Sequence, residues 1–215
     1  MGKREVTIPL REMDLEGELE LGDSSSLVIF AHGSGSGRHS PRNQFVARTL
    51  REAGMGTLLF DLLTAEEEVI EERTAHLRFN IPLLAERLVG ATRWVLDEGS
   101  ERDLRIGYFG ASTGAAAALV AAAQVRDAVG AVVSRGGRPD LAGEALGQVT
   151  APTLLIVGGD DRPVIPLNEE AYGRLRCEKE MRIVRGASHL FEESGTLETV
   201  AALAAKWFAV HLEAA

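Results

Sequence analysis

The chain has 215 residues, of which 45% are hydrophobic, and its formal net charge is -9. This length and apolar content suffice for one continuous core, so we expect a single domain over residues 1–215. The acidic balance and the lack of a long Lys/Arg run argue against a nucleic-acid partner held by phosphate contacts. Cys177 is the only cysteine, which excludes a secreted scaffold built on intramolecular disulfides.

The first residues of the chain lack the apolar stretch of a signal peptide. The longest apolar run, residues 115–123, is shorter than the roughly 20 residues that are needed to span a bilayer. We therefore expect a cytoplasmic protein with no membrane partner, present as a monomer or a homodimer.

Residues 6–9 and 13–21 predict an antiparallel hairpin at the start, because apolar and polar residues alternate along the second of these segments. Short apolar runs follow, with room for helices between them, which is typical of parallel strands buried on both faces. These predicted strands are residues 27–31, 57–60, 104–109, 129–133, 153–157 and 181–184.

Helical segments are expected between and after the parallel strands, with Ser40 as N-cap and Pro41 as first residue of the first helix. They are residues 41–53, 82–97, 114–124, 167–175 and 196–212. The segment of residues 64–78, which is rich in glutamate, predicts a solvated helix or flap. This alternation predicts a doubly wound α/β sheet, whose ligands lie at the carboxyl ends of the strands.

Residues 110–114, Gly-Ala-Ser-Thr-Gly, connect a predicted strand to a predicted helix. A Gly-x-Ser-x-Gly segment in this setting is typical of a sharp, strained turn that lifts the serine hydroxyl clear of the sheet. The N-terminus of the following helix favours the negative charge that develops during attack on a carbonyl. Ser112 is therefore the candidate nucleophile.

A Gly-rich loop, residues 32–37, follows the predicted strand at residues 27–31. Gly/Ser runs are common connectors and phosphate cradles, so this loop alone is weak support for a catalytic role. Together with the turn at Ser112 it becomes a candidate half of an oxyanion hole, in which the backbone N–H of Ser34 joins that of Thr113. We expect His32 to orient this loop rather than to act as a base.

Asp160 and Asp161 come just after a predicted strand, and His189 lies in the loop after the last one. Of the five histidines, only His189 follows both the serine and the acid in a strand-to-helix loop. The chain order serine, acid, histidine differs from the orders of the chymotrypsin and subtilisin folds.

These motifs resemble those of the α/β-hydrolase superfamily, and within it the small, lid-less dienelactone hydrolase-like enzymes, over nearly the whole chain. The resemblance implies an α/β-hydrolase fold with a mostly parallel central sheet of about eight strands, flanked by helices and without a cap domain. In such proteins the acid commonly lies in a Gly-x-x-Asp-x-x-Val segment, which residues 158–164 match with Asp161 as the acid, leaving Asp160 as second choice.

One departure concerns the nucleophile. Dienelactone hydrolases use a cysteine, whereas this chain has Ser112 at that position, so the lactone substrate is not carried over. Residues 39–43 also resemble a segment of hydrolase domains that lie beside phosphoribosyltransferase domains in some bacterial proteins.

Motifs and resemblance together predict a serine hydrolase that cleaves small carboxylic esters, with Ser112, His189 and Asp161 as a triad and an open site. No cofactor is expected, and no His or Cys spacing indicates a metal site. Arg135 and Arg138 are candidate pocket residues for a carboxylate or phosphate, although ordinary solvated arginines are the plainer interpretation.

Two alternatives stay open. The first is a non-catalytic ligand-binding module, because the fold alone does not determine activity. The second is an engineered serine hydrolase on this scaffold, because sequence alone does not separate a natural pocket from a redesigned one.

Overall fold

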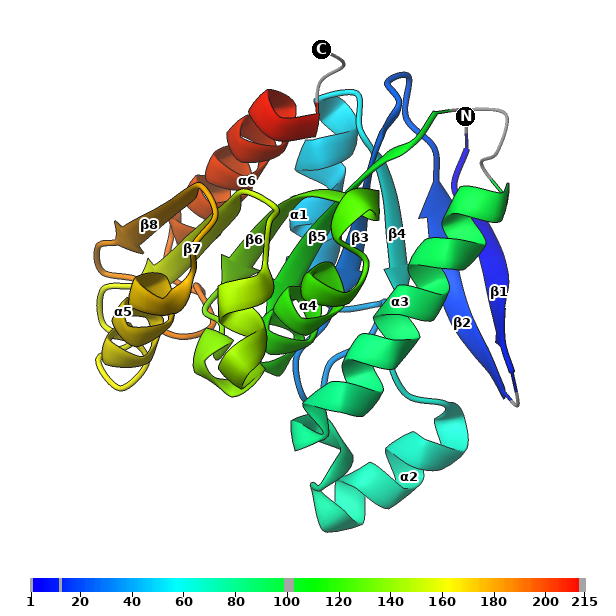
Figure 1. Ribbon diagram of the computed structural model, residues 1–215, viewed down its shortest axis with the longest axis horizontal. Coiled ribbons are helices and arrows are strands. Elements are labelled where there is room, and N and C mark those ends of the chain that lie inside the picture. Colours follow the sequence, from blue (N-terminus) through cyan, green and yellow to red (C-terminus); the bar gives the residue numbers. More distant parts are fainter. Residues whose placement is uncertain (1, 12, 99–102, 213–215) are drawn as a thin grey trace.

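The computed structural model describes residues 2–11, 13–98 and 103–212. In these residues the chain forms an eight-stranded sheet with the order β1-β2-β4-β3-β5-β6-β7-β8 (Figure 1). The strands are β1 (Arg4–Leu10), β2 (Met13–Glu20), β3 (Ser26–Ala31), β4 (Gly56–Phe60), β5 (Arg105–Ala111), β6 (Val129–Arg135), β7 (Thr153–Gly158) and β8 (Lys179–Val184). The predicted sheet of about eight strands is therefore confirmed.

The β1–β2 hairpin is antiparallel, and β2 also pairs antiparallel with β4. All other neighbours in the sheet are parallel. In the hairpin, Val6, Ile8 and Leu15 are buried while Thr7, Pro9 and Asp14 are exposed, as the alternating sequence predicted. Parallel strands bring their carboxyl ends to one edge, so the loops that follow β3, β5, β6, β7 and β8 emerge close together.

Helices cover both faces of the sheet (Figure 1). One face carries α3 (Ile81–Glu98), α4 (Thr113–Gln124), η3 (Pro139–Gln148) and α5 (Ile165–Arg174), and the other carries α1 (Pro41–Glu52) and α6 (Thr196–Leu212). Successive side chains of a strand therefore enter different cores. Tyr108 of β5 lies in the core under α3 and α4, and Phe109 lies in the core under α1 and α6.

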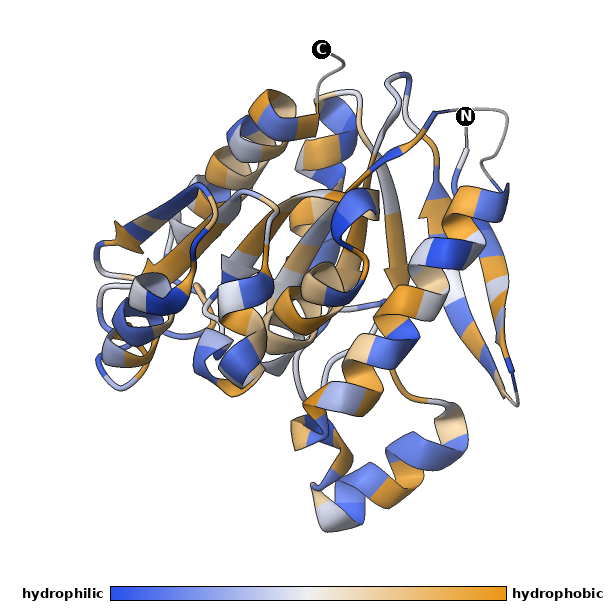
Figure 2. Cartoon of the chain, viewed as in Figure 1, coloured by the Kyte–Doolittle hydropathy of each residue, from blue (hydrophilic) through white to orange (hydrophobic). Residues whose placement is uncertain are grey.

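The apolar residues of the sequence follow this layering. The central strands are almost continuously hydrophobic, whereas the helices carry hydrophilic residues on their outer sides (Figure 2). Asn43, Val46, Ala47 and Leu50 form the buried side of α1 at helical spacing. Ser40 caps this helix by accepting from the Asn43 N–H, and Pro41 is its first residue, as predicted.

Residues 64–78 form the predicted flap-like segment, which consists of α2 (Ala65–Thr74) and the short helix η1 (Leu77–Phe79). Thr64 and Glu67 form a capping box at the start of α2. This segment protrudes from the body beside the N-terminal end of α3 (Figure 1), and no separate cap domain covers the carboxyl edge in the described residues.

Two elements were missed by the sequence pattern. Residues 139–148 form η3, interrupted at Gly143, where φ is 55° and ψ is -130°. Two short turns separated by such a break do not produce the periodicity that reveals a helix. A further short turn, η2 (Arg126–Ala128), precedes β6.

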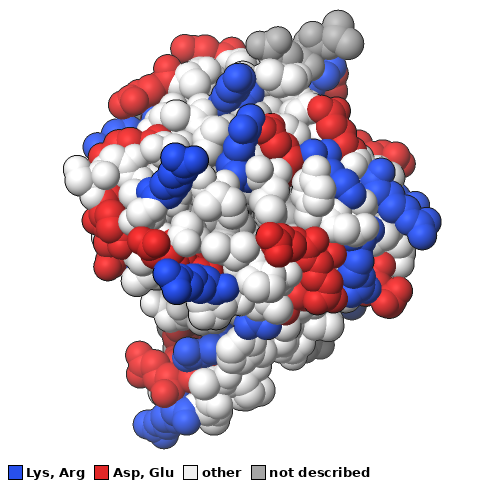
Figure 3. All heavy atoms as spheres, turned by 90° about the vertical axis from the view of Figure 1, so that its left-hand side faces the viewer, with Lys and Arg blue, Asp and Glu red and all other residues white. Residues whose placement is uncertain are grey.

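The surface charge is mixed on the face that α5 and β8 occupy. Figure 3 shows basic and acidic side chains interspersed over it, so the negative net charge is not gathered there in one patch. Within residues 2–11, 13–98 and 103–212, none of the helices combines the length and hydropathy needed to cross a membrane.

Candidate active site

Ser112 lies on the sharp turn between β5 and α4. Its φ of 51° and ψ of -122° are unusual for a residue with a side chain, and Ser112 is held there by hydrogen bonds on both sides. Its N–H donates to the Arg135 carbonyl at 3.3 Å, and its carbonyl accepts the Arg138 N–H at 3.0 Å. The turn therefore presents the serine side chain at the carboxyl edge of the sheet.

Close packing allows this turn to form. A Cβ placed on Gly114 would lie 2.2 Å from the Ala31 carbonyl oxygen, so α4 begins directly against the end of β3. A Cβ on Gly33 would lie 2.9 Å from the Ser112 Cβ, which shows that the Gly-rich loop touches the serine side chain. The two glycine-containing motifs of the sequence are thus in contact.

His32 orients the Gly-rich loop. Its buried ring accepts the Leu62 N–H at Nε2 (2.9 Å), so Nδ1 carries the proton and donates to the Gly33 carbonyl (2.9 Å). Burial lowers the pKa of His32, which favours this neutral form. With both ring nitrogens occupied by backbone groups, His32 has no nitrogen left to serve as a base.

Ser34 and Thr113 lie next to each other at this edge, with their side-chain hydroxyl oxygens 3.1 Å apart. Thr113 is the first residue of α4, so its backbone N–H has no acceptor inside the helix. This N–H and the positive end of the helix dipole are therefore available to a negatively charged oxygen beside Ser112.

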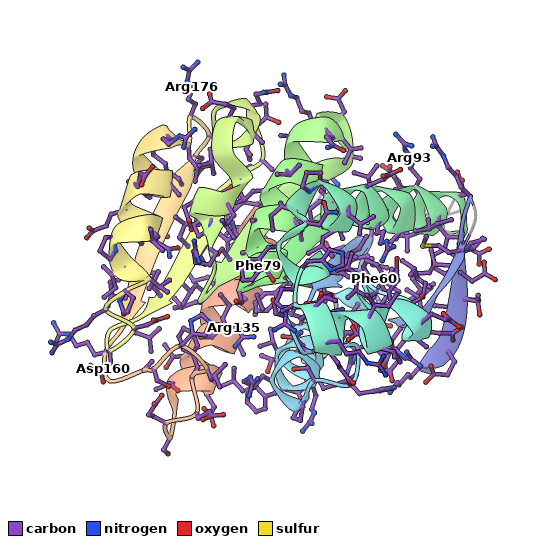
Figure 4. All side chains as sticks on the ribbon, turned by 90° about the horizontal axis from the view of Figure 1, so that it is seen from below. Phe60, Phe79, Arg93, Arg135, Asp160 and Arg176 are labelled. Carbon is purple, nitrogen blue, oxygen red and sulfur yellow. The ribbon has the colours of Figure 1, made fainter. Side chains whose placement is uncertain are left out.

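His189 and Asp161 are joined by a hydrogen bond of 2.6 Å between His189 Nδ1 and Asp161 Oδ2. Asp161 is buried, whereas the His189 side chain is 38% exposed, so the ring is held from the protein side and open on the solvent side. Asp160 is exposed, its N–H donates to the Ala187 carbonyl, and Figure 4 shows it at the outer edge of the molecule. Of the two candidate acids, Asp161 is thus the one that contacts the histidine.

The segment after β6 connects the serine to the histidine. Arg135 and Arg138 bond to the Ser112 backbone, and between them a Cβ on Gly136 would lie 3.0 Å from the His189 carbonyl oxygen and 3.7 Å from His189 Nδ1. The structure therefore brings all three candidate triad residues to one place. In the described residues the Ser112 hydroxyl makes no hydrogen bond, and such bonds in hydrolases often tighten only when substrate is present.

The two predicted pocket arginines have different surroundings. Arg138 is paired bidentately with Asp140 at 2.9 and 2.8 Å, and this carboxylate raises the pKa of Arg138. Arg135 is only 6% exposed, so the expectation of an ordinary solvated arginine is wrong for it. Its side chain lies against Phe191, with Cζ 5.9 Å from the ring centroid, and donates from Nη2 to Asn43 Oδ1 at 3.4 Å.

Arg42 and Asn43, at the start of α1, belong to the surroundings of Arg135 and were not predicted as site residues. One sequence signal could have revealed them. Asn43 occupies a position of the apolar face of α1, together with Val46, Ala47 and Leu50, and a polar residue on such a face indicates a buried polar contact.

No group of three or more His, Cys, Asp or Glu side chains in the described parts of the chain is arranged to hold a metal ion.

The chain matches the family described as "Alpha/beta hydrolase domain" over residues 24–207. It therefore belongs to the α/β-hydrolase family. A crystal structure of a dienelactone hydrolase from Anabaena variabilis is 55% identical, covers 99% of each chain and superposes with a TM-score of 0.96. The chain is thus a dienelactone hydrolase-like member of this family.

Other relatives are informative in different ways. Two curated proteins from strains of Mycobacterium tuberculosis, both named putative phosphoribosyl transferase, are 54% identical over 209 residues, which is 97% of this chain and 46% of theirs. The chain thus spans about half the length of these relatives. A serine hydrolase without a lid from Xanthomonas campestris, 18% identical with a TM-score of 0.78 over 99% of this chain and 96% of that one, shares the fold.

Proposed function

We propose that the protein is a serine hydrolase that cleaves a carboxylic ester, or a related acyl bond, through an acyl-enzyme. The observation that carries this proposal is the 2.6 Å bond between His189 Nδ1 and Asp161, beside a serine on a strained strand-to-helix turn. Supporting it, the family is one of hydrolases, and some solved relatives with the same fold are esterases.

In the proposed mechanism the Nδ1–H of His189 donates to Asp161, which leaves Nε2 free to accept the Ser112 hydroxyl proton. Ser112 Oγ then attacks the carbonyl carbon, and the resulting oxyanion accepts hydrogen bonds from the N–H groups of Ser34 and Thr113. His189 returns the proton to the leaving alcohol, and the C–O bond of the ester breaks. Water, deprotonated by the same histidine, releases the acid and restores Ser112.

Small or solvent-accessible esters suit this site best. His189 is partly exposed, and no cap domain encloses the carboxyl edge in the described residues. The transferase name belongs to proteins about twice as long, so we do not carry that activity to this chain. A non-catalytic binding module or an engineered hydrolase pocket remain the competing proposals.

The experiment is labelling with a fluorophosphonate probe, read by intact mass, together with turnover of 4-nitrophenyl acetate. Wild type should gain one adduct and hydrolyse the ester, and Ser112→Ala should do neither. Ser25→Ala, at the amino end of β3 and so at the opposite edge of the sheet, is the matched control and should behave as wild type. Labelling that does not depend on Ser112, or wild type that neither labels nor turns over ester, would contradict the proposal and favour a binding module.

A further inference from the structure

Arg135 is a buried cation without a carboxylate partner among the described residues. Its hydrogen bond to Asn43 Oδ1 is long, at 3.4 Å, and its Nε is buried without an acceptor. Burial lowers the pKa of Arg135 to about 10, and the nearby charge of Arg42 adds to this effect. A buried guanidinium is normally paired, so an incompletely paired one indicates a missing acceptor.

Arg42 also has an N–H group without a hydrogen-bond acceptor. Its Nε is also buried without an acceptor, and its nearest carboxylate in the described residues, Glu192, is bound only at 3.4 Å from Nη1. Glu192 is 63% exposed, and exposed pairs of this kind contribute little. Arg42 directly precedes Asn43, which accepts the hydrogen bond of Arg135, so the two arginines lie on adjoining segments, and each has an Nε–H without an acceptor.

These two arginines lie beside the proposed triad. Arg135 is the last residue of β6 and pairs in register with Ala111, which precedes Ser112. The ring under its guanidinium belongs to Phe191, two residues after His189. Phe191 is fully buried with a φ of 56°, a rare conformation for a bulky residue, so this ring is held in place at some conformational cost.

A solvent-open cleft borders Arg42, while Arg135 and Ser112 are not among the residues that line it. It has a volume of about 480 Å³, and Arg42 lines one wall together with the Gly-rich loop. Glu68, Glu71 and Glu72 of α2 also line this cleft, and Glu71 is paired there with Arg78. Burial and the neighbouring Asp61 and Glu71 raise the pKa of Glu68, a sign of crowded negative charge. Glu68 and Glu72 thus disfavour an anion beside α2, whereas Arg42 favours one on its own side of the cleft.

We infer that Arg135 and Arg42 form a subsite for an anionic group, a carboxylate or a phosphate, of the ester that Ser112 attacks. The inference rests on the proposed function and specifies its substrate class. An oxygen anion held by the two guanidinium groups would supply the partner that these cations lack, and planar guanidinium groups match carboxylate and phosphate oxygens well. Figure 4, which views the carboxyl edge, shows Arg135 in the middle of the molecule and Arg93 and Arg176 at its periphery.

The first test measures binding without catalysis. Inorganic phosphate and succinate are titrated by calorimetry into the Ser112→Ala variant, at constant ionic strength. At least one should bind, and adding Arg135→Gln or Arg42→Gln should weaken it at least tenfold, the size of one charge-assisted hydrogen bond. Adding the exposed control Arg176→Gln should change nothing, although it removes the same charge. Preference for phosphate or for succinate distinguishes a phosphate-bearing from a carboxylate-bearing substrate.

Two further variants sharpen this test. Glu192→Gln removes the carboxylate that competes for Arg42 and should tighten anion binding. Arg135→Lys keeps the charge and should retain part of the affinity. If the buried substitution Arg135→Gln fails to fold by circular dichroism, the partly exposed Arg42→Gln carries the test alone. Binding that is absent for both anions, or equal in every variant, would overturn the inference.

The second test measures substrate preference in the wild-type background. Two ester pairs are compared: 4-nitrophenyl hemisuccinate with 4-nitrophenyl butyrate, and 4-acetoxybenzoate with phenyl acetate. The anionic member of at least one pair should have the higher kcat/KM, by about tenfold or more, and Arg135→Gln should abolish that ratio. A ratio within one variant is unaffected by a general loss of activity.

The outcomes separate the two proposals. Anion binding to the Ser112→Ala variant, with no ester turnover by wild type, would overturn the serine hydrolase and leave the anion site standing. Ester turnover with no anion preference and no anion binding would overturn the subsite and leave the hydrolase standing.

Discussion

Gly114 is the position where a single added carbon should have the largest effect on both stability and activity. It is the second residue of α4, and a Cβ there would lie 2.2 Å from the Ala31 carbonyl oxygen and 2.4 Å from that of His32. An ordinary carbon–oxygen contact requires about 3.3 Å. The Gly114→Ala substitution therefore requires α4 to move about 1 Å away from the end of β3, because backbone carbonyls cannot rotate aside as a side chain can.

The expected losses of stability and of activity follow from this displacement. Overpacking of a tight contact lowers the free energy of unfolding by about 1–3 kcal/mol, partly offset by the roughly 0.5–1 kcal/mol that alanine gains over glycine in a helix. Ser112 and Thr113 immediately precede Gly114, so they move with it. A displacement of about 1 Å in a catalytic group lowers the rate by about 10²-fold, and we expect kcat/KM for 4-nitrophenyl acetate to fall by that factor.

The assay combines urea denaturation with ester turnover, and Gly173→Ala is the matched control. Gly173 lies in α5, where a Cβ would meet nothing within 4 Å. The same substitution there should raise the free energy of unfolding by about 0.4–1 kcal/mol and leave turnover unchanged. If Gly114→Ala unfolds at the wild-type urea concentration and retains wild-type kcat/KM, the argument from close packing is refuted.

Two further predictions concern the acid and the loop histidine. Asp161→Asn should lower kcat by about 10²–10⁴-fold, because the amide no longer holds His189 in the tautomer that accepts from serine, while Asp160→Asn should stay within about twofold. Equal losses in a 4-nitrophenyl acetate assay would leave the acid unassigned and contradict this prediction. For His32, burial holds the folded-state pKa below the ordinary histidine value of 6.5, so the unfolded chain binds the extra proton first and stability is lost as the pH falls below about 6.5. The slope should approach 1.4 kcal/mol per pH unit. Urea midpoints between pH 7.5 and 5.5 should fall more steeply for wild type than for His32→Gln, and parallel slopes would show that His32 does not titrate.

Much of the fold could be predicted from the sequence, because strands and helix starts depend on residues that are close together in the chain. A parallel strand buried on both faces must be a run of apolar residues, so β3, β5, β6 and β7 were recognisable within one or two residues of their ends. Ser40 and Pro41 indicated the start of α1, because an N-cap side chain accepts a hydrogen bond from an N–H only three residues further along the chain. The η3 segment was missed, since Gly143 interrupts its periodicity.

The candidate nucleophile could likewise be recognised from residues that are neighbours in the sequence. Ser112 is defined by five consecutive residues that join a strand to a helix, and this setting determines a turn whatever the rest of the chain does. The choice between Asp160 and Asp161, in contrast, could not be made from neighbouring residues in the sequence. Two adjacent residues in a loop point in different directions, and only packing against the loop of His189 decides which carboxylate meets the ring.

The surroundings of Arg135 depended wholly on tertiary structure. In the sequence it is an arginine after a strand, with nothing to distinguish it from the neighbouring Arg138. The fold pairs Arg138 with Asp140 two residues away, but encloses Arg135 between Asn43 of α1 and Phe191, residues that lie 92 and 56 positions away in the chain. The sequence alone determined the strands, the sharp turn after β5 and the position of Ser112 on it, since each depends on residues that are close together in the chain. Burial and charge pairing depend on which distant segments pack together, so only the folded chain decided which carboxylate contacts His189 and which arginine is buried beside the turn at Ser112.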